Sequence, residues 1–348
     1  MMNTNDLTLD DFEKEMPRAV TIAQVIAALL NEDRIFPPAY LPRFSDLSPD
    51  DIQALTNVWP QVTLNRRQNL MEDLQTLAAS DYMLSFEEIA RLAVQDEDPL
   101  VRFGGVQTLI ANECSNPALI HLFLGLLEGD ADENVRAASA SALGAFVYAG
   151  EIGKISPALL ESLEARLLQA FSVQHSALVR RCVLESLGFS SRPEVPALIR
   201  QAAESGEEAW QTSALFAMGR SADEIWCSYV LAMLESPRAS LRAEAARAAG
   251  ELELKEARTL LRTLADDDDE DVRAAALWSL SQIGGRGVRE VLQRHLDASD
   301  DETEIAFLED ALDNLAFTDG EDTFDLLNIS PEDDFSDEDF FDDESNED

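Results

Sequence analysis

One phrase recurs along the chain. A polar or acidic stretch leads into an apolar residue, then an Arg, then small residues, and the phrase closes on Gly. Its copies run over Asp132–Gly144, Leu178–Gly188, Ser240–Gly250 and Glu270–Gly284, with weaker ones at Asp98–Arg102 and, with Gln211 in the Arg position, Glu207–Gly219. From Arg180 to Gln211, to Arg242 and to Arg273 the step is 31 residues each time. A fixed period of this length indicates an architecture of stacked repeats.

Each copy has room for two helices. In the copy that ends at Gly284, apolar side chains recur at helical spacing from Val272 to Ile283, and a second apolar stripe begins at Val288. A helix pair of this size cannot bury its apolar faces alone, whereas stacked neighbours can. The sequence therefore predicts an all-α fold, an α-α superhelix of stacked antiparallel helix pairs.

These repeats resemble the HEAT-repeat family, in particular the short bacterial repeats of phycobilin lyases. The resemblance is carried by phrases such as Asp-Glu-Asp-Val-Arg-Ala-Ala-Ala at Asp269–Ala276 and by the Leu-Gly at Leu143-Gly144, and it covers roughly Leu64 to Leu315. It implies a HEAT/armadillo-type solenoid whose second helices line the concave surface. It also implies a protein-binding role and no particular reaction.

The N-terminal flank differs from the repeats. Ser48 followed by Pro49 and two acids is a strong helix start, and Pro60 ends that helix. We expect residues 1–63 to form a helical cap on the repeats, which occupy residues 64–317. A recognition arm is the alternative for this first segment.

The C-terminal flank, residues 318–348, alternates carboxylates with apolar side chains, among them Phe335, Phe340 and Phe341. Such a run buries too little apolar surface to offset its ordering entropy. We therefore expect a disordered acidic tail.

Charge limits the partners. The chain has 68 acidic and 26 basic residues, a formal net charge of −42. A field of this sign repels phosphate backbones and anionic membrane surfaces. We therefore expect no nucleic-acid and no membrane partner. We expect one or more protein partners, basic ones among them, and a monomeric chain.

Cysteine usage and hydropathy bear on location. Cys114, Cys182 and Cys227 are scattered and odd in number, which favours reduced thiols in a reducing compartment. The most apolar early run, Ala19–Leu30, is about half the length that a membrane span needs. An acidic start lacks the basic region of a signal peptide. These features predict a cytoplasmic protein.

The sequence lacks the common motifs of catalytic and metal-binding sites. Deoxyhypusine hydroxylase, of the same superfamily, holds two irons with His-Glu pairs, but His121, His175 and His295 are each followed by another residue than Glu. Neither a GxSxG elbow nor a phosphate-binding GxxxxGK[ST] loop occurs. We therefore expect no catalysis, no metal and no cofactor.

The recurrent Arg needs a physical reason, because a cation in the first turn of a helix opposes the helix dipole. Its periodicity predicts that each Arg pairs with a carboxylate of the same or the neighbouring repeat. The resulting ladder would contain Arg102, Arg136, Arg180, Arg242 and Arg273. A ligand-binding role for these arginines is the alternative.

Second helices supply the candidate binding residues. Trp226 and Tyr229 are the aromatic candidates for a groove, although helix-spaced aromatics more often belong to a core. The basic candidates are Arg258, Arg262, Arg289 and Arg294. Arg258 and Arg289 are 31 residues apart and would form a positive strip. The acidic tail would compete for that strip with an acidic partner segment, or else remain a solvated polyanion.

These observations favour a protein-protein interaction scaffold or adaptor that uses the concave face of a solenoid. Two alternatives remain open. One is an accessory subunit of cofactor attachment, specifically of a bilin, and the other is an acidic, chaperone-like binder of a basic protein.

Overall fold

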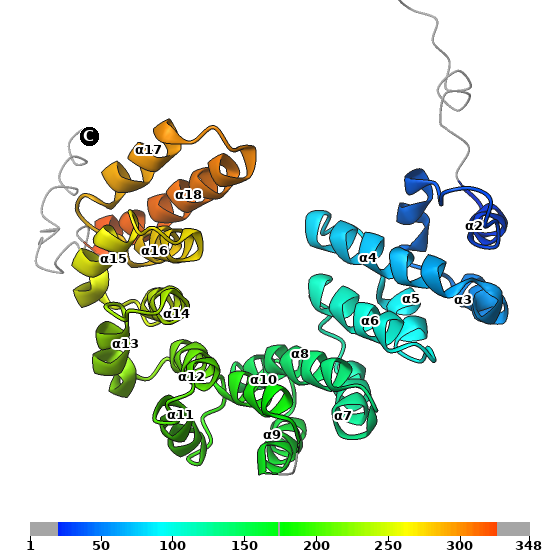
Figure 1. Ribbon diagram of the computed structural model, residues 1–348, viewed down its shortest axis with the longest axis horizontal. Coiled ribbons are helices and arrows are strands. Elements are labelled where there is room, and N and C mark those ends of the chain that lie inside the picture. Colours follow the sequence, from blue (N-terminus) through cyan, green and yellow to red (C-terminus); the bar gives the residue numbers. More distant parts are fainter. Residues whose placement is uncertain (1–19, 173–174, 326–348) are drawn as a thin grey trace, which may run out of the picture. The chain divides into compact units, whose positions relative to one another are not determined.

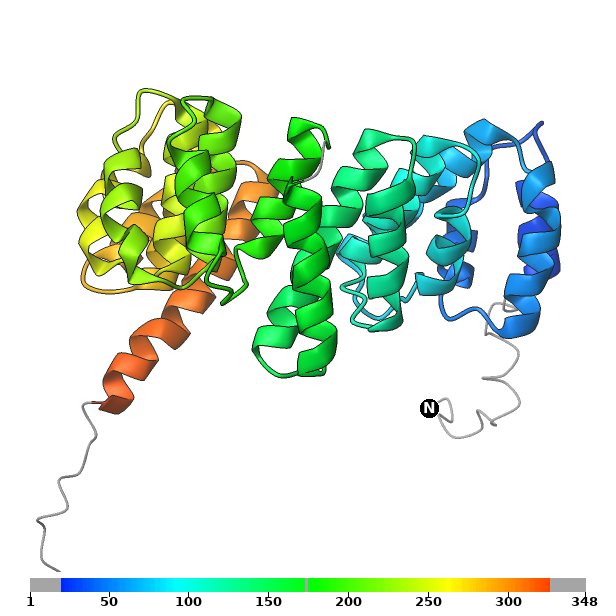
Figure 2. The ribbon, with the colours of Figure 1, turned by 90° about the horizontal axis from the view of Figure 1, so that it is seen from below.

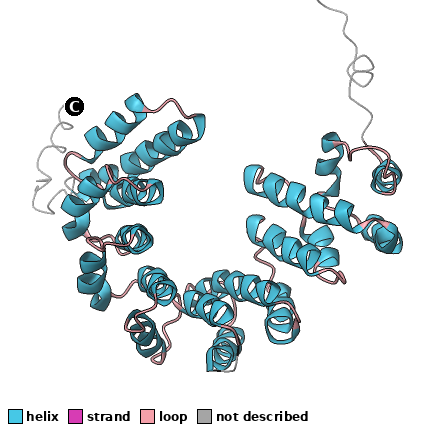
Figure 3. Ribbon diagram, viewed as in Figure 1, coloured by secondary structure: helices cyan, strands magenta, loops and turns pink. Residues whose placement is uncertain are grey.

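The computed structural model describes residues 20–172 and 175–325, and within them every regular element is a helix (Figure 3). The chain divides into two compact units, Met1–Ser221 and Ala222–Asp348, so that the expected array at 64–317 is distributed over both. Unit 1 contains α2 (Ile22–Leu29), η1 (Pro38–Phe44), α3 (Pro49–Val58), η2 (Trp59–Gln61), α4 (Leu64–Ser80), α5 (Glu87–Ala93), α6 (Pro99–Ala111), α7 (Ala118–Gly129), α8 (Glu133–Glu151), α9 (Pro157–Ser172), α10 (Ala177–Leu187), α11 (Val195–Ala203) and α12 (Glu208–Arg220). Unit 2 contains η3 (Glu224–Trp226), α13 (Cys227–Met233), α14 (Ala239–Glu251), η4 (Lys255–Ala257), α15 (Arg258–Leu264), α16 (Glu270–Ile283), α17 (Val288–Ala298) and α18 (Glu302–Asp325).

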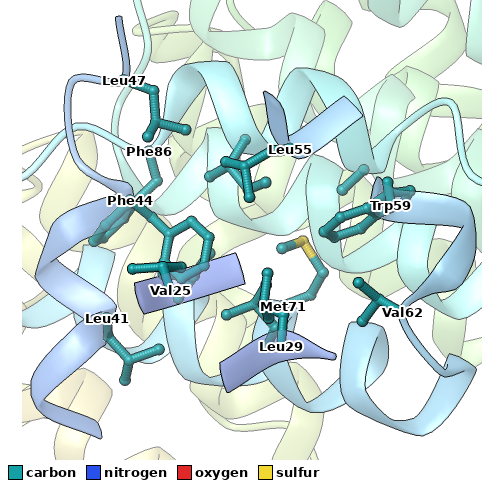
Figure 4. Close-up of a cluster of buried hydrophobic side chains, with 14 of the residues drawn as sticks. Val25, Leu29, Leu41, Phe44, Leu47, Leu55, Trp59, Val62, Met71 and Phe86 are labelled. Carbon is teal, nitrogen blue, oxygen red and sulfur yellow. The ribbon is translucent and has the colours of Figure 1, made fainter. Parts of the chain in front are cut away.

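The N-terminal helices share one core with the first repeat. Val25 and Leu29 of α2 pack with Phe44, Leu55 and Met71, which come from η1, α3 and α4 (Figure 4). The predicted start of α3 is confirmed, because the Ser48 hydroxyl accepts a hydrogen bond from the Asp51 N–H at 3.2 Å and Pro49 opens the helix. A common core of this kind is what a cap on the repeats requires.

The structure pairs the helices differently from the prediction made from the sequence. The sequence placed the helix with the repeat Arg first in each pair and the second helix after it. In the structure these helices pack more extensively on the helix before them than on the helix after them, as in α7–α8 and α15–α16. The reason lies in the turn between the two helices, where the repeat Arg is bound.

Each unit has two layers. We call the helices that carry the repeat Arg, or stand in its place, the Arg layer, and their partners the partner layer. The Arg layer consists of α4, α6, α8, α10 and α12 in unit 1 and of α14, α16 and α18 in unit 2. Figure 1 shows α8, α10 and α12 along one side of unit 1 and α7, α9 and α11 along the other.

The Arg layer is the concave side of each unit. Successive Arg-layer helices pack extensively on one another, whereas α7 and α9 touch only slightly. A stack whose two layers are unequally spaced curves toward the closer one. The expectation that the second helices line the concave surface is therefore wrong, and the helices with the repeat Arg line it instead.

Small residues make this close approach possible. A Cβ on Gly188 would lie 2.7 Å from the Cα of Ala217, and one on Gly144 would lie 3.3 Å from the Cα of Ser186. The Ser186 hydroxyl also donates to the carbonyl oxygen of Ala140 at 2.7 Å and thus joins α10 to α8. Gly144, Gly188 and Gly250 are therefore packing residues between neighbouring Arg-layer helices, whereas Gly284 ends α16 with a positive φ.

The last helix is longer than expected. The sequence placed the start of the tail at residue 318, but α18 continues to Asp325 (Figure 2). Once Leu308 and Leu315 are buried against the unit, each further helical residue adds a hydrogen bond without a new nucleation cost. Phe335, Phe340 and Phe341 lie outside the described residues.

Candidate functional site

The repeat arginines bind the turns between paired helices. In unit 1, Arg102 makes a bidentate ion pair with Asp130, with Nε–Oδ2 and Nη2–Oδ1 distances of 2.7 and 2.8 Å. Its remaining nitrogen, Nη1, donates to the carbonyl oxygens of Asp96 and Glu97, each at 2.9 Å. The Arg102 guanidinium therefore binds both the turn before α6 and the turn before α8.

The acceptor Asp130 has two roles. Its carboxylate receives Arg102 and the N–H of Asp132 at 2.9 Å, and its backbone carbonyl receives Nη1 of Arg136 at 2.7 Å. The Asp132 carboxylate in turn caps α8. Because Asp96 receives the Arg67 side chain in the same manner, a continuous chain of contacts runs through the turns. Its members in order are Arg67, Asp96, Arg102, Asp130 and Arg136.

Unit 2 repeats the arrangement. Arg242 makes a bidentate pair with Asp267, at 2.9 and 2.8 Å, and donates to the carbonyl oxygen of Ser236 at 2.9 Å. Arg273 donates to the carbonyl oxygens of Asp267 and Asp268 at 2.8 and 3.1 Å. The same device thus orders the turns in both units.

The ladder shifts the titration of its members. Hydrogen bonding from Arg242 holds the pKa of Asp267 below its ordinary value, against the opposing effect of burial. Burial raises the pKa of Asp130, but the hydrogen bonds from Arg102 and from the backbone outweigh it and the net pKa is lowered. Both carboxylates are therefore ionised at neutral pH, and both pairs are structural.

Not every predicted rung is an ion pair. Arg136 and Arg273 bind carbonyl oxygens, as described above. Arg180 donates from Nε to the Phe171 carbonyl at 3.0 Å and lies over the rings of Phe171 and Trp210, 5.1 and 5.4 Å from their centroids. Within residues 20–172 and 175–325 it forms no ion pair, so the predicted carboxylate partner of Arg180 is wrong there. The turn before it lacks the Asp that α6 and α8 have before them.

The aromatic candidates on the second helix do not form a groove. Trp226 is 5% exposed and belongs to the core, and Tyr229 is half-buried beside it in α13. The expectation of Trp226 as a binding residue is therefore wrong. Trp226 lies at the end of η3, and its ring is buried in unit 2.

The basic strip is largely occupied within unit 2. The Arg258 guanidinium lies against Gly285, so close that a Cβ there would be 2.7 Å from its Cζ, and Arg262 donates to the carbonyl oxygen of Arg286. Arg294 pairs with Asp266 at 3.0 Å. Arg289 is exposed. Two of these arginines therefore support the turn before α17 and do not form a free surface.

A different surface, which the sequence reasoning missed, lies on the concave side of unit 1. The rings of Tyr148 and Phe189 contact each other at a tilt of 55°, with their centroids 5.5 Å apart. The Arg220 guanidinium lies over Phe189 and Phe216, 5.5 and 4.8 Å from their centroids. Tyr148 is 50% exposed and Ile110, on α6, is 37% exposed. We call Ile110, Tyr148, Phe189, Phe216 and Arg220 the concave stripe.

A hollow adjoins the stripe between α6, α7 and α8. Its volume is about 340 Å³, and Ile110, Phe123, Ala145 and Ala149 are among its mainly apolar lining, with Cys114 at its edge. A volume of this size suits a small ligand or an apolar side chain.

The sequence did contain a signal for the stripe. Phe216, Phe189 and Tyr148 follow the repeat Arg, or its Gln, by five, nine and twelve residues. Because a helix turns by about 100° per residue, these offsets lie within one face. The spacing of these three aromatic residues from the repeat Arg or Gln is therefore the signal that indicates a common surface.

The described part of the chain also bears on metal binding and on membrane crossing. Residues 20–172 and 175–325 contain no group of three or more His, Cys, Asp or Glu side chains placed to hold a metal. In the same residues no helix combines the length and the apolar character that crossing a membrane requires.

Comparison with known proteins identifies the repeat. Residues 228–313, within unit 2, match the family model for HEAT repeats. The Asp–Arg turns of unit 1 have the same construction as those in the matched segment. The fold is an all-α solenoid of the HEAT type.

Several solved structures are similar at low identity. The complex of CpcE and CpcF of phycocyanin lyase from Nostoc sp. PCC7120 is 20% identical, with 66% of this chain and 94% of that chain covered and a TM-score of 0.46. Human deoxyhypusine hydroxylase in complex with glycerol is 16% identical, with 85% and 96% covered and a TM-score of 0.36. No curated protein matches the chain. Similarity at this level does not transfer an activity or a partner to this chain.

Proposed function

We propose that this chain is a scaffold that binds partner proteins through the concave face of unit 1. The observation that carries the proposal is the concave stripe, in which exposed apolar and aromatic side chains from successive helices lie beside a hollow. Apolar side chains that gather on one surface, with polar residues around them, are typical of protein-binding sites. Stacked helix repeats, such as those of residues 228–313 that match HEAT repeats, supply an extended frame for such a surface.

The remaining features are proposed with the scaffold. We propose a monomeric, non-catalytic chain that works in the cytoplasm of a bacterium. The thiols of Cys114, Cys182 and Cys227 are free, which suits a reducing compartment. A net charge of −42 favours basic over acidic partners.

Affinity capture from the native cell tests the scaffold. Tyr148→Asp places a charge in the concave stripe, and Tyr82→Asp places the same charge on a Tyr that is 82% exposed elsewhere in unit 1. We expect the wild type and Tyr82→Asp to retain the same partners and Tyr148→Asp to lose them. Equal recovery by both variants would contradict a role for the concave face.

The bilin alternative makes a separate prediction. An accessory of bilin attachment would bind the chromophore, and the purified chain mixed with a free bilin would then show a shifted visible absorbance. A scaffold leaves the absorbance of the bilin unchanged. The acidic, chaperone-like alternative predicts instead that binding depends on net charge and disappears at high salt.

A further inference from the structure

The hollow beside the concave stripe has a simple structural origin. Helix α6 ends at Ala111, whereas α8 continues to Glu151. Counted from their repeat arginines, Ala111 and Ala145 are equivalent, so the last residues of α8 have no counterpart in α6. Ala149, one of these last residues, lines the hollow with Ala145 and with Phe123 of α7, and the small alanine side chains leave space. An apolar side chain of a partner fits against these apolar residues, and Glu113 is the charged residue of the lining.

Carboxylates accompany the aromatic pair next to the hollow. Glu151 follows Tyr148 by three residues, and its Oε1 accepts the Ser191 N–H at 2.7 Å, which places it near the turn after Phe189. Glu185 precedes Phe189 by one helical turn, and its Oε1 accepts the Ser213 hydroxyl at 2.5 Å. Aromatic faces flanked by carboxylates attract Lys and Arg side chains, through cation–π contact and charge.

We propose that the concave stripe of unit 1 binds an extended segment of a partner protein that carries an apolar anchor and, about three residues later, an Arg or Lys. The anchor enters the hollow between α6 and α8, and the cation lies on the exposed ring of Tyr148, beside the Glu151 carboxylate. This inference rests on the proposed scaffold function and specifies the chemistry of its partner.

The spacing follows from helix packing. Neighbouring packed helices lie about 9 Å apart. A segment in the polyproline II conformation advances about 3.1 Å per residue with three residues per turn, so residues three apart span one helix spacing and face the same side. Beyond the pair, Arg220 already lies over Phe189 and Phe216. A second cation one helix further along would meet that guanidinium, so the segment carries an apolar or acidic residue there.

Thiol footprinting tests this inference directly. The probe is a synthetic peptide of Gly and Ser with one Leu and, three residues later, one Arg, used at millimolar concentration with the full chain. Iodoacetamide labelling of Cys114, which lines the hollow, is compared by mass spectrometry with labelling of Cys227 in unit 2. Burial and the nearby Glu87 raise the pKa of Cys114 to about 11, so the labelling is done at mildly alkaline pH. We expect the peptide to slow labelling of Cys114 several-fold and to leave Cys227 unchanged.

Matched peptides and variants decide the outcome. Replacing the Arg of the peptide by Glu should abolish the protection, and Tyr148→Ala should weaken it about tenfold, which corresponds to about 1.4 kcal/mol. Tyr82→Ala serves as the control for loss of an exposed Tyr and should leave it unchanged. Equal protection by the Arg and Glu peptides, equal effects of the two Tyr variants, or no protection at all would overturn the inference. If protection fails while Tyr148→Asp still abolishes capture of cellular partners, the scaffold function stands and only the proposed partner chemistry is wrong.

Discussion

The turns before α6 and α8 and the turns before α10 and α12 meet the same need with different chemistry. Before α8, the turn carries Asp130, whose carboxylate and carbonyl bind Arg102 and Arg136. Before α10, Arg180 lies on the rings of Phe171 and Trp210. We call the first region the ladder region and the second the aromatic region. The comparison teaches that the side chain at the repeat position, an Arg or the Gln211 of α12, closes the turn, and that its partner is interchangeable.

Removal of an Arg from the ladder region should have the largest effect. Arg102→Ala leaves the largely buried Asp130 carboxylate without its bidentate partner, and we expect a loss of about 3 kcal/mol in the free energy of unfolding. Urea unfolding of the full chain measures it. Arg166→Ala is the matched control, since Arg166 pairs with Glu128 at 2.6 Å in an exposed setting, and it should cost less than about 1 kcal/mol. Equal losses would mean that the ladder is no more than a set of surface ion pairs.

The ladder region should also lose stability in acid. The pKa of Asp130 is lowered in the folded state, so its contribution is fully present above the unfolded value of about 3.9 and is lost as the pH falls through the lower folded value. We expect Asp130→Asn to be about 2 kcal/mol less stable than the wild type at neutral pH. That difference should shrink only below about pH 4. A difference that does not vary with pH would show that the charge of Asp130 is unimportant.

The aromatic region should respond to a change of ring and not to acid. Trp210→Leu removes one of the two rings under Arg180 and keeps an apolar side chain, and we expect a loss of about 1 kcal/mol. Neither Arg nor Trp titrates between neutral pH and the acid range, so the loss should be the same at both. Chemical unfolding at two pH values measures it, and a loss that disappears in acid would show that Arg180 depends on a carboxylate.

The smallest expected effect has the opposite sign. Burial raises the pKa of Glu164 on α9, although the hydroxyl of Ser190 donates to its carboxylate and opposes the shift. A carboxyl group with a raised pKa destabilises the fold while it is ionised, and the protein gains stability as the pH falls through that raised value. We expect Glu164→Gln to be more stable by about 0.5–1 kcal/mol at neutral pH, with no difference once the carboxyl group is protonated in both states. Thermal unfolding against pH measures the gain, and a less stable Gln variant would show that the charge of Glu164 is needed.

The Asp130 and Glu164 carboxylates should respond to acid in opposite directions. Asp130 is held by a cation and stabilises the ladder region above its pKa, whereas Glu164 has a hydroxyl partner and stabilises the fold only when it is protonated. The ladder region should therefore open first in acid. Amide exchange of α6 and α8, compared with that of α9 and α10, would show the order.

The sequence by itself determined the helices, their stacking and the existence of a role for the repeat Arg. These properties are local or periodic: Ser48 caps its own helix, and a step of 31 residues repeats the same contacts. Gly144, Gly188 and Gly250 also follow from the period, since each meets the next Arg-layer helix at an equivalent place.

The tertiary structure alone decided which helix each repeat helix pairs with, which layer is concave and which partner each Arg takes. Pairing depends on the turn that Arg102 closes, and curvature depends on contacts between residues as far apart as Gly188 and Ala217. The hollow beside Tyr148 arises because α8 is longer than α6, a difference that is plain in the sequence only when the two helices are already side by side. Long-range packing creates such surfaces, and a repeat pattern that describes each copy separately does not contain them.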